Sequence, residues 1–252
     1  MIRSNFKHIN IRRIFLLILG IVISMGIIHM LFYLSTKSSM DSDDIVHRLF
    51  HKVSMAGETN LPAWFNASLW FLLGIVSLLV SVLLKIDPNH SQKTRNFRKG
   101  GGILTLVAFY ASLDETTYIH ENFHLVIDWL FGRFSNFDLD FSWTLPGAIL
   151  AAFVGFMLLG FLGLFTRPVQ YGLMLGGGVF LLGALGMETI GLTWYSHFGT
   201  DTNYQLFVIV EESLEMLGIA IALCALIYSV GYKVEEDGSL SLRLFLKEGD
   251  NK

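Results

Sequence analysis

The segment YGLMLGGGVFLLGALGMETIG, residues 171–191, is a run of apolar and small residues with one ionisable side chain, Glu188. A helix needs about 20 mostly apolar residues to cross a membrane, and this segment is long enough. At about 100° per residue, its small residues fall into two stripes: Gly172, Gly176, Gly183 and Gly186 in one, and Gly177, Ala184, Glu188 and Gly191 in the other. Small residues let helices approach closely in lipid, so we predict a transmembrane helix that is packed from two sides and sits centrally.

The composition of the whole chain is that of a membrane protein. Of its 252 residues, 53% are hydrophobic and only 15% are charged, with a mean hydropathy of +0.55, whereas soluble domains carry about 25% charged residues. The net charge is −3, which is small and gives no sign of nucleic-acid binding. We expect the lipid bilayer as partner and no nucleic acid. The single cysteine, Cys224, excludes a disulfide framework and a CxxC metal site.

Six stretches are long and apolar enough to span a membrane. They cover about 12–35, 62–86, 101–131, 143–165, 170–195 and 204–230. We therefore predict an all-α fold, a polytopic membrane helix bundle that forms a single membrane domain over residues 1–252, with a tail at 231–252. Within the tail, residues 239–246 alternate as a short strand or an interfacial segment would.

Basic residues gather at one set of connections. Lys and Arg precede the first stretch and follow the second, fourth and sixth, whereas the other connections are mixed or acidic, as in DSDD at 41–44. The positive-inside rule therefore predicts that both termini are cytoplasmic. The first stretch lacks a small-residue cleavage site, so we expect it to be retained as an anchor.

Ionisable side chains are concentrated in the predicted outer half of the membrane. The directions of the helices put the polar groups of the third, fifth and sixth stretches at a similar depth. On the third stretch, Asp114, Glu121 and His124 share one helical face, whereas His120 lies at its margin and Glu115 points away. One cavity could therefore collect acids from three helices.

No basic residue balances these acids, because the apolar cores of the six stretches contain no Lys or Arg. A charged carboxylate at mid-helix costs about 2.5–3.5 kcal/mol on insertion scales, so the cluster requires protonation, a water-filled cavity or a bound cation. The Glu-x-x-His spacing at 121–124 and the facing carboxylates favour a divalent metal: zinc, iron or manganese. The predicted metal ligands are Asp114, His120, Glu121, His124, Glu188, Glu211, Glu212 and Glu215. A lone histidine on the first stretch, His29, is interpreted as structural.

Three functions fit such a site, and whether the protein is an enzyme stays open. The favoured hypothesis is a metal-dependent membrane enzyme, in which a spare carboxylate acts as general base toward a metal-bound water or a lipid-like substrate. The alternative is a proton- or cation-coupled transporter for a small ion, against which the lack of an inverted repeat or a Pro-broken helix pair counts. A third hypothesis is a non-enzymatic structural envelope protein. The oligomeric state is not predicted.

Four strings together resemble an uncharacterised family of bacterial multi-pass membrane proteins. They are GETNLPAWFNASLW (57–70), SLDETTYIHENF (112–123), GALGMETIG (183–191) and VEESLEMLG (210–218). The resemblance covers roughly residues 45–230. It implies a multi-pass protein of the bacterial inner (plasma) membrane, carries no activity over, and draws attention to Glu58 as a further acid on the outer side.

Overall fold

The computed structural model describes residues 6–38, 45–57, 59–86, 92–117, 119 and 144–247, and within these ranges the protein is mostly helical. The helices are α1 (Ile11–Ser38), α2 (Ile45–Val53), α3 (Leu61–Ile86), α4 (Gln92–Thr117), α6 (Thr144–Leu162), α7 (Arg167–Leu181), the π-helix η1 (Leu182–Met187), α8 (Glu188–Phe198) and α9 (Thr202–Tyr228). The strands are β1 (Lys7–His8), β2 (Val230–Val234) and β3 (Leu240–Leu244).

Three of the described helices are long and apolar enough to cross a membrane, judged by length and composition. They are Ile11–Lys37, Leu61–Ile86 and the continuous helix Arg167–Phe198, which α7, η1 and α8 form together. Pro146–Leu162 of α6 is apolar but shorter. Each of the six predicted stretches contains a helix, but among the described residues only these three helices meet the requirement, so the helical class of the fold is confirmed and the number of spans is not.

The third predicted stretch, 101–131, lies only in part within the described residues. Its helix, α4, begins earlier and ends at Thr117, and Ile119 lies in a turn. The hydroxyls of Thr116 and Thr117 both donate to the carbonyl oxygen of Leu113, each at 2.8 Å. Hydroxyls that bond to the preceding turn of backbone compete with the helical ladder and favour a helix end.

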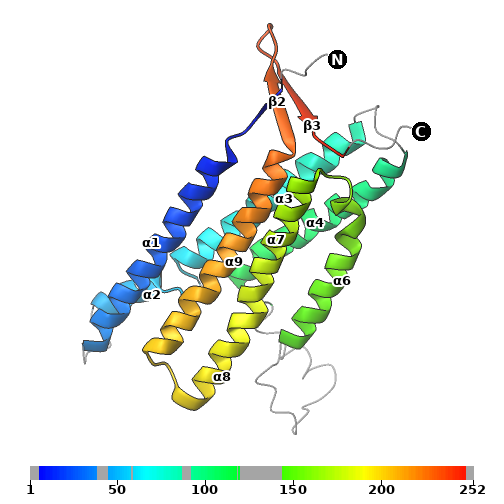
Figure 1. Ribbon diagram of the computed structural model, residues 1–252. Coiled ribbons are helices and arrows are strands. Elements are labelled where there is room, and N and C mark those ends of the chain that lie inside the picture. The colour runs from blue at the N-terminus through cyan, green and yellow to red at the C-terminus, as the bar shows by residue number, and fades with distance from the viewer. Residues whose placement is uncertain are drawn as a thin grey trace.

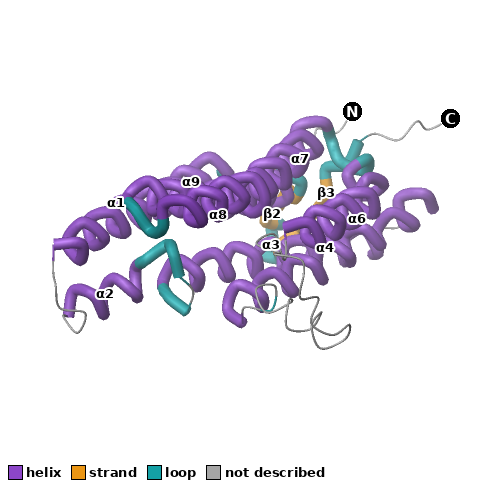
Figure 2. The backbone as a smooth tube through the Cα atoms, turned by 90° about the horizontal axis from the view of Figure 1, so that it is seen from below, coloured by secondary structure: helices purple, strands orange, loops and turns teal. Residues whose placement is uncertain are grey.

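α9 is the central helix of the bundle. It packs against α1, α3 and the continuous α7–η1–α8 helix. Figure 1 shows α1, α9 and α7 side by side, and Figure 2, turned by 90°, shows α3, α4 and α6 forming a second row behind them. The fifth predicted stretch was expected to hold this central place, but Gly177 on its second stripe is exposed, and a Cβ added there would have no atom within 4 Å.

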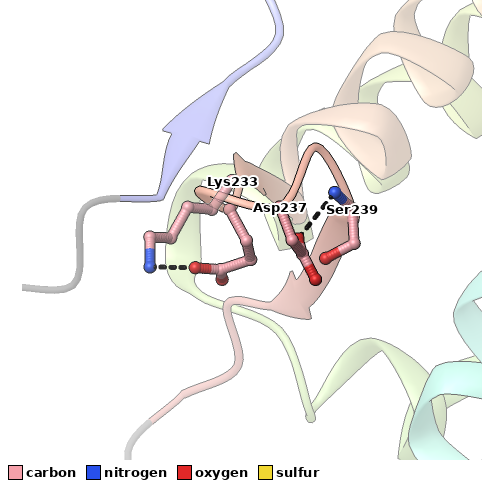
Figure 3. Close-up of polar contacts among 4 residues, drawn as sticks. Lys233, Asp237 and Ser239 are labelled. Carbon is pink, nitrogen blue, oxygen red and sulfur yellow. Dashed lines mark hydrogen bonds and ion pairs between the residues drawn. The ribbon is translucent and has the colours of Figure 1, made fainter.

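A three-stranded antiparallel sheet, in the order β1-β2-β3, lies at one end of the bundle (Figure 1). Lys7 pairs with Tyr232, which in turn pairs with Leu242 of β3, so of the two alternatives for residues 239–246 the structure shows a strand, over Leu240–Leu244. The turn between β2 and β3 is held by Lys233, which binds Glu235, and by Asp237, which accepts a hydrogen bond from the Ser239 amide (Figure 3). The sheet therefore fixes the two ends of the described chain at the same end of the bundle.

Candidate functional site: a carboxylate cluster around Glu215

The α7–α8 helix meets α9 along its glycines. A Cβ added to Gly176 would lie 2.7 Å from the backbone nitrogen of Ala222, and one added to Gly172 would lie 2.6 Å from the Cβ of Ala225. Further along, a Cβ on Gly183 would lie 2.8 Å from the Glu211 carbonyl oxygen and 2.9 Å from the Glu215 Cγ. Only glycine fits these positions, and the contact brings η1 directly against the acidic part of α9.

The π-helix turns the residues that follow it toward α9. In an uninterrupted α-helix, Gly183 and Gly191 would differ by about 80° and belong to separate stripes. In the structure both face α9, because a Cβ on Gly191 would lie 3.8 Å from a carboxylate oxygen of Glu211. A π turn holds one extra residue and rotates the following helix by roughly 100°. Glu188, the first residue of α8, is carried round by the same rotation.

Five carboxylates lie within electrostatic range of one another around Glu215. The charges of Glu212, Glu115, Glu211 and Glu188 all act on Glu215, and the charge of Glu188 also acts on Glu211. All five residues are partly buried. They come from three parts of the fold, namely α4, the start of α8 and the middle of α9. We call these five residues the carboxylate cluster.

Glu115 is the residue of α4 that reaches the cluster, although the sequence predicted that it points away. Asp114, the predicted ligand, follows a different direction of the same helix, and its charge acts on Tyr110 one turn back. Consecutive helical residues differ by about 100°, so the two acids face different surroundings. The predicted face aligned Asp114 with Glu121 and His124, which lie outside the described residues.

The predicted metal centre is not tested. His120, Glu121 and His124, together with Glu58, lie outside the described residues. Within the part of the chain that the structure describes, no group of three His, Cys, Asp or Glu side chains is arranged to hold a metal ion. Glu188, Glu211, Glu212 and Glu215 are brought together as the sequence predicted, and their role as ligands stays a prediction.

Two polar side chains of α3, Asn66 and Trp70, were missed by the sequence reasoning. Asn66 is 0% exposed and Trp70 is 8% exposed. Neither amide atom of Asn66, nor the indole nitrogen of Trp70, has a hydrogen-bond partner within the described part of the chain. An asparagine in the middle of an apolar stretch is the signal that could have found this site, because a buried amide without a partner is costly.

His29 is structural, as predicted. Its ring is fully buried. The Met55 amide donates a hydrogen bond to Nδ1 at 2.9 Å, so the ring proton is on Nε2. Nε2 in turn donates to the side-chain oxygen of Gln205 at 3.0 Å. A neutral imidazole with both nitrogens occupied joins α1 to α9 and to the connection before α3. In that connection, the Asn60 side chain donates to the Ser54 carbonyl oxygen at 2.8 Å.

The corner between α8 and α9 is held by Asp201. Its carboxylate accepts hydrogen bonds from the Tyr204 amide at 2.8 Å and from the Trp194 indole at 2.9 Å. These bonds, the Tyr204 amide first, hold the pKa of Asp201 below its ordinary value. Asp201 is thereby the N-cap of α9 and fixes where that helix begins.

Comparison with known proteins places the chain in a family without assigning it an activity. Residues 13–230 match the family model described as "Domain of unknown function (DUF8692)", and the chain belongs to this family. The match includes the whole of the segment 45–230 on which the resemblance to an uncharacterised family rested. No curated protein and no solved structure matches the chain.

Proposed function

We propose that this member of the DUF8692 family is an ion-coupled transporter, in which the carboxylate cluster binds a proton or another small cation and releases it on the other side of the membrane. The protein is a six-span bundle of the bacterial inner membrane with both termini in the cytoplasm. This topology is supported by the six apolar stretches, by the bias of Lys and Arg toward alternate connections, and by the sheet that joins the two ends of the described chain at one end of the bundle.

The observation that carries the proposal is the position of Glu215 among other acids. α9 has 27 residues, and Glu215 is at its midpoint, roughly 20 Å from either end at 1.5 Å per residue. Four more carboxylates act on it, and α9 itself contains no Lys, Arg or His. Carboxylates that repel each other at mid-membrane depth are relieved by a proton or a cation, and intramembrane acids of this kind mark ion pathways.

The π-helix adds support for transport. Transporters commonly bind their ions where a membrane helix is interrupted, and π segments within α-helices are frequent at functional sites. Here the interruption, Leu182–Met187, lies inside a 32-residue apolar helix and directly against Glu211 and Glu215. The sequence shows no proline at this interruption, which is why a helix break was not predicted.

Proton flux into proteoliposomes tests the proposal. A pH gradient is imposed on vesicles that contain a trapped pH-sensitive dye, and the flux is measured with and without Na⁺, K⁺ or a divalent cation. We expect Glu215→Gln to abolish the flux, because the amide cannot take up a proton. The matched control is Glu236→Gln, which makes the same change in the exposed turn between β2 and β3. Equal flux in wild type and Glu215→Gln would refute the proposal.

A metal-dependent membrane enzyme acting on a lipid-like substrate is the second candidate. It is favoured by the gathering of Glu188, Glu211 and Glu215 with Glu115, which lies five residues before the predicted ligand His120. Elemental analysis of the purified protein separates the two candidates. Stoichiometric zinc, iron or manganese that is lost in Glu215→Gln would favour the enzyme, and metal-free protein with proton flux would favour the transporter. If the purified protein contains no metal and shows no proton flux, both candidates are refuted and the structural envelope role is favoured.

A further inference from the structure

A pocket of about 320 Å³ opens between the end of α3 and the start of α4. Its described lining is Ser81, Val82, Lys85, Lys99 and Gly102. Both lysines are exposed, and the described lining contains no acid. Within the part of the chain that the structure describes, neither ammonium group has an ion pair or a hydrogen bond. Two like charges that line one pocket repel each other, so the pocket favours an anion as its occupant.

The two glycines that follow one another at the start of α4 explain why a pocket forms here. A Cβ on Gly101 would collide with the Ser81 hydroxyl, so the two helices are closely packed at this point. The Ser77 hydroxyl of α3 also donates to the Gly101 carbonyl oxygen at 2.9 Å. A Cβ on Gly102, by contrast, would have no atom within 4 Å. Gly101 therefore joins α4 to α3, and Gly102 leaves open space beside that junction.

Both lysines lie where the apolar part of their helix ends. The candidate span Leu61–Ile86 ends one residue after Lys85, and the predicted stretch 101–131 begins two residues after Lys99. α3 contacts β3, so this boundary is at the end of the bundle that carries the sheet (Figure 1). The proposed topology puts that end on the cytoplasmic side. Headgroups lie just outside the hydrocarbon layer, so the two ammonium groups are at the level of the lipid phosphates.

Exposed apolar side chains continue from the pocket toward the middle of both helices. Leu78 precedes Lys85 by seven residues and Leu106 follows Lys99 by seven residues, and this spacing puts each pair on one helical face. Leu78 is 48% exposed and Leu106 is 71% exposed. A soluble anion would contact the lysines alone, whereas a phospholipid would also cover these leucines with its acyl chains. The apolar surface beside the charged pocket therefore favours a lipid.

We propose that this pocket binds an anionic phospholipid of the cytoplasmic leaflet, whose phosphate accepts hydrogen bonds from Lys85 and Lys99. Basic pockets between membrane helices on the cytoplasmic side are suited to anionic headgroups. The occupant carries a net negative charge, as phosphatidylglycerol does, because the ammonium group of a zwitterionic headgroup would offset the attraction of the two lysines. This inference goes beyond the proposed transport function: it uses the proposed topology and does not involve the carboxylate cluster.

Native mass spectrometry of the full-length protein, released from detergent micelles, tests the inference. The probes are phosphatidylglycerol, phosphatidylcholine with the same acyl chains, and glycerol 3-phosphate, which has the phosphate but no acyl chain. We expect phosphatidylglycerol to bind at least about tenfold more tightly than phosphatidylcholine, and glycerol 3-phosphate not to displace it. If the two lipids bind equally, or if neither binds, the inference is wrong. Displacement by an equal concentration of glycerol 3-phosphate would assign the pocket to a soluble anion instead.

A double variant, Lys85→Gln with Lys99→Gln, removes the positive charge of the pocket. The matched control is Lys7→Gln with Lys247→Gln, which removes the same charge from two exposed lysines beside the sheet. We expect the pocket variant to bind phosphatidylglycerol at least about tenfold more weakly, and the control to differ from wild type by about twofold at most. Equal losses in the two variants would show a general attraction to the basic end of the bundle and would overturn the inference.

Gly102→Leu fills the pocket without a change of charge. The matched control is Gly20→Leu, which makes the same change in α1 at a position where a Cβ also has no atom within 4 Å. We expect Gly102→Leu to weaken phosphatidylglycerol binding severalfold and Gly20→Leu to leave it unchanged. The thermal midpoint of Gly102→Leu without added lipid should be no lower than that of wild type. If Gly102→Leu keeps full affinity, the lipid does not enter the pocket and the inference is wrong.

Discussion

Replacement of Gly183 by alanine should force η1 and α9 apart at the carboxylate cluster. The new Cβ would lie 2.8 Å from the Glu211 carbonyl oxygen and 2.9 Å from the Glu215 Cγ, whereas ordinary van der Waals contact begins at 3.4 Å, so the two helices must separate locally by roughly half an ångström. Overpacking of this kind costs about 1–3 kcal/mol. Alanine recovers about 0.5–1 kcal/mol of that cost through its better helix propensity. We expect a net destabilisation of up to about 2.5 kcal/mol.

Gly178→Ala is the matched control, because it makes the same chemical change in α7 where a new Cβ has no atom within 4 Å. This variant should gain about 0.5–1 kcal/mol from helix propensity alone. Reversible unfolding of both variants in mixed micelles, followed by tryptophan fluorescence, gives the difference in the free energy of unfolding. If Gly183→Ala is as stable as Gly178→Ala, the close approach of η1 to α9 is refuted.

Two further predictions concern the polar joints that flank the cluster. His29→Leu leaves the Met55 amide and the buried Gln205 side chain without their partner, so the free energy of unfolding should fall by about 2 kcal/mol or more. The control is His197→Leu, at an exposed histidine. If the two variants lose the same stability, His29 does not join these helices as described. Because the pKa of Asp201 is lower in the folded than in the unfolded protein, its ionised form stabilises the fold at neutral pH, and this stabilisation is lost as the pH falls through the folded-state value. Asparagine also caps helices but does not titrate. The thermal midpoint of wild type should therefore exceed that of Asp201→Asn at neutral pH, and this difference should shrink below about pH 3.9. A difference that stays constant from pH 7 to pH 3 would show that the charge of Asp201 does not stabilise the fold.

The positions of the helices could be predicted from the sequence, because long apolar runs leave few alternatives to helix and the start of α9 carries its own N-cap. The strand at Leu240–Leu244 was likewise visible in its alternation. α2 was not predicted, since its nine residues are too few to span a membrane and its surroundings are polar. The predicted end of the third stretch, at residue 131, lies outside the described residues and stays a prediction.

The carboxylate cluster was predicted in part. The acids of α9 and Glu188 could be assigned to one depth, since depth follows from counting residues at a fixed rise. Direction around the helix axis is less predictable, because one π turn rotates everything beyond it and has no marker in the string LGALGM. The charge of Glu115, which the sequence predicted to point away, acts on Glu215.

The convergence of α4 and α9 on one buried site is tested most directly by chemical cross-linking. In a Cys224→Ala background, which removes the native thiol, Glu115→Cys is combined with Glu215→Cys, and Asp114→Cys with Glu215→Cys as the matched pair. The protein in nanodiscs is treated with a short bifunctional thiol reagent, and the cross-linked fraction is measured by mass spectrometry after digestion. We expect cross-linking of the 115–215 pair to exceed that of the 114–215 pair severalfold. Equal yields, or a higher yield for the 114–215 pair, would contradict the carboxylate cluster.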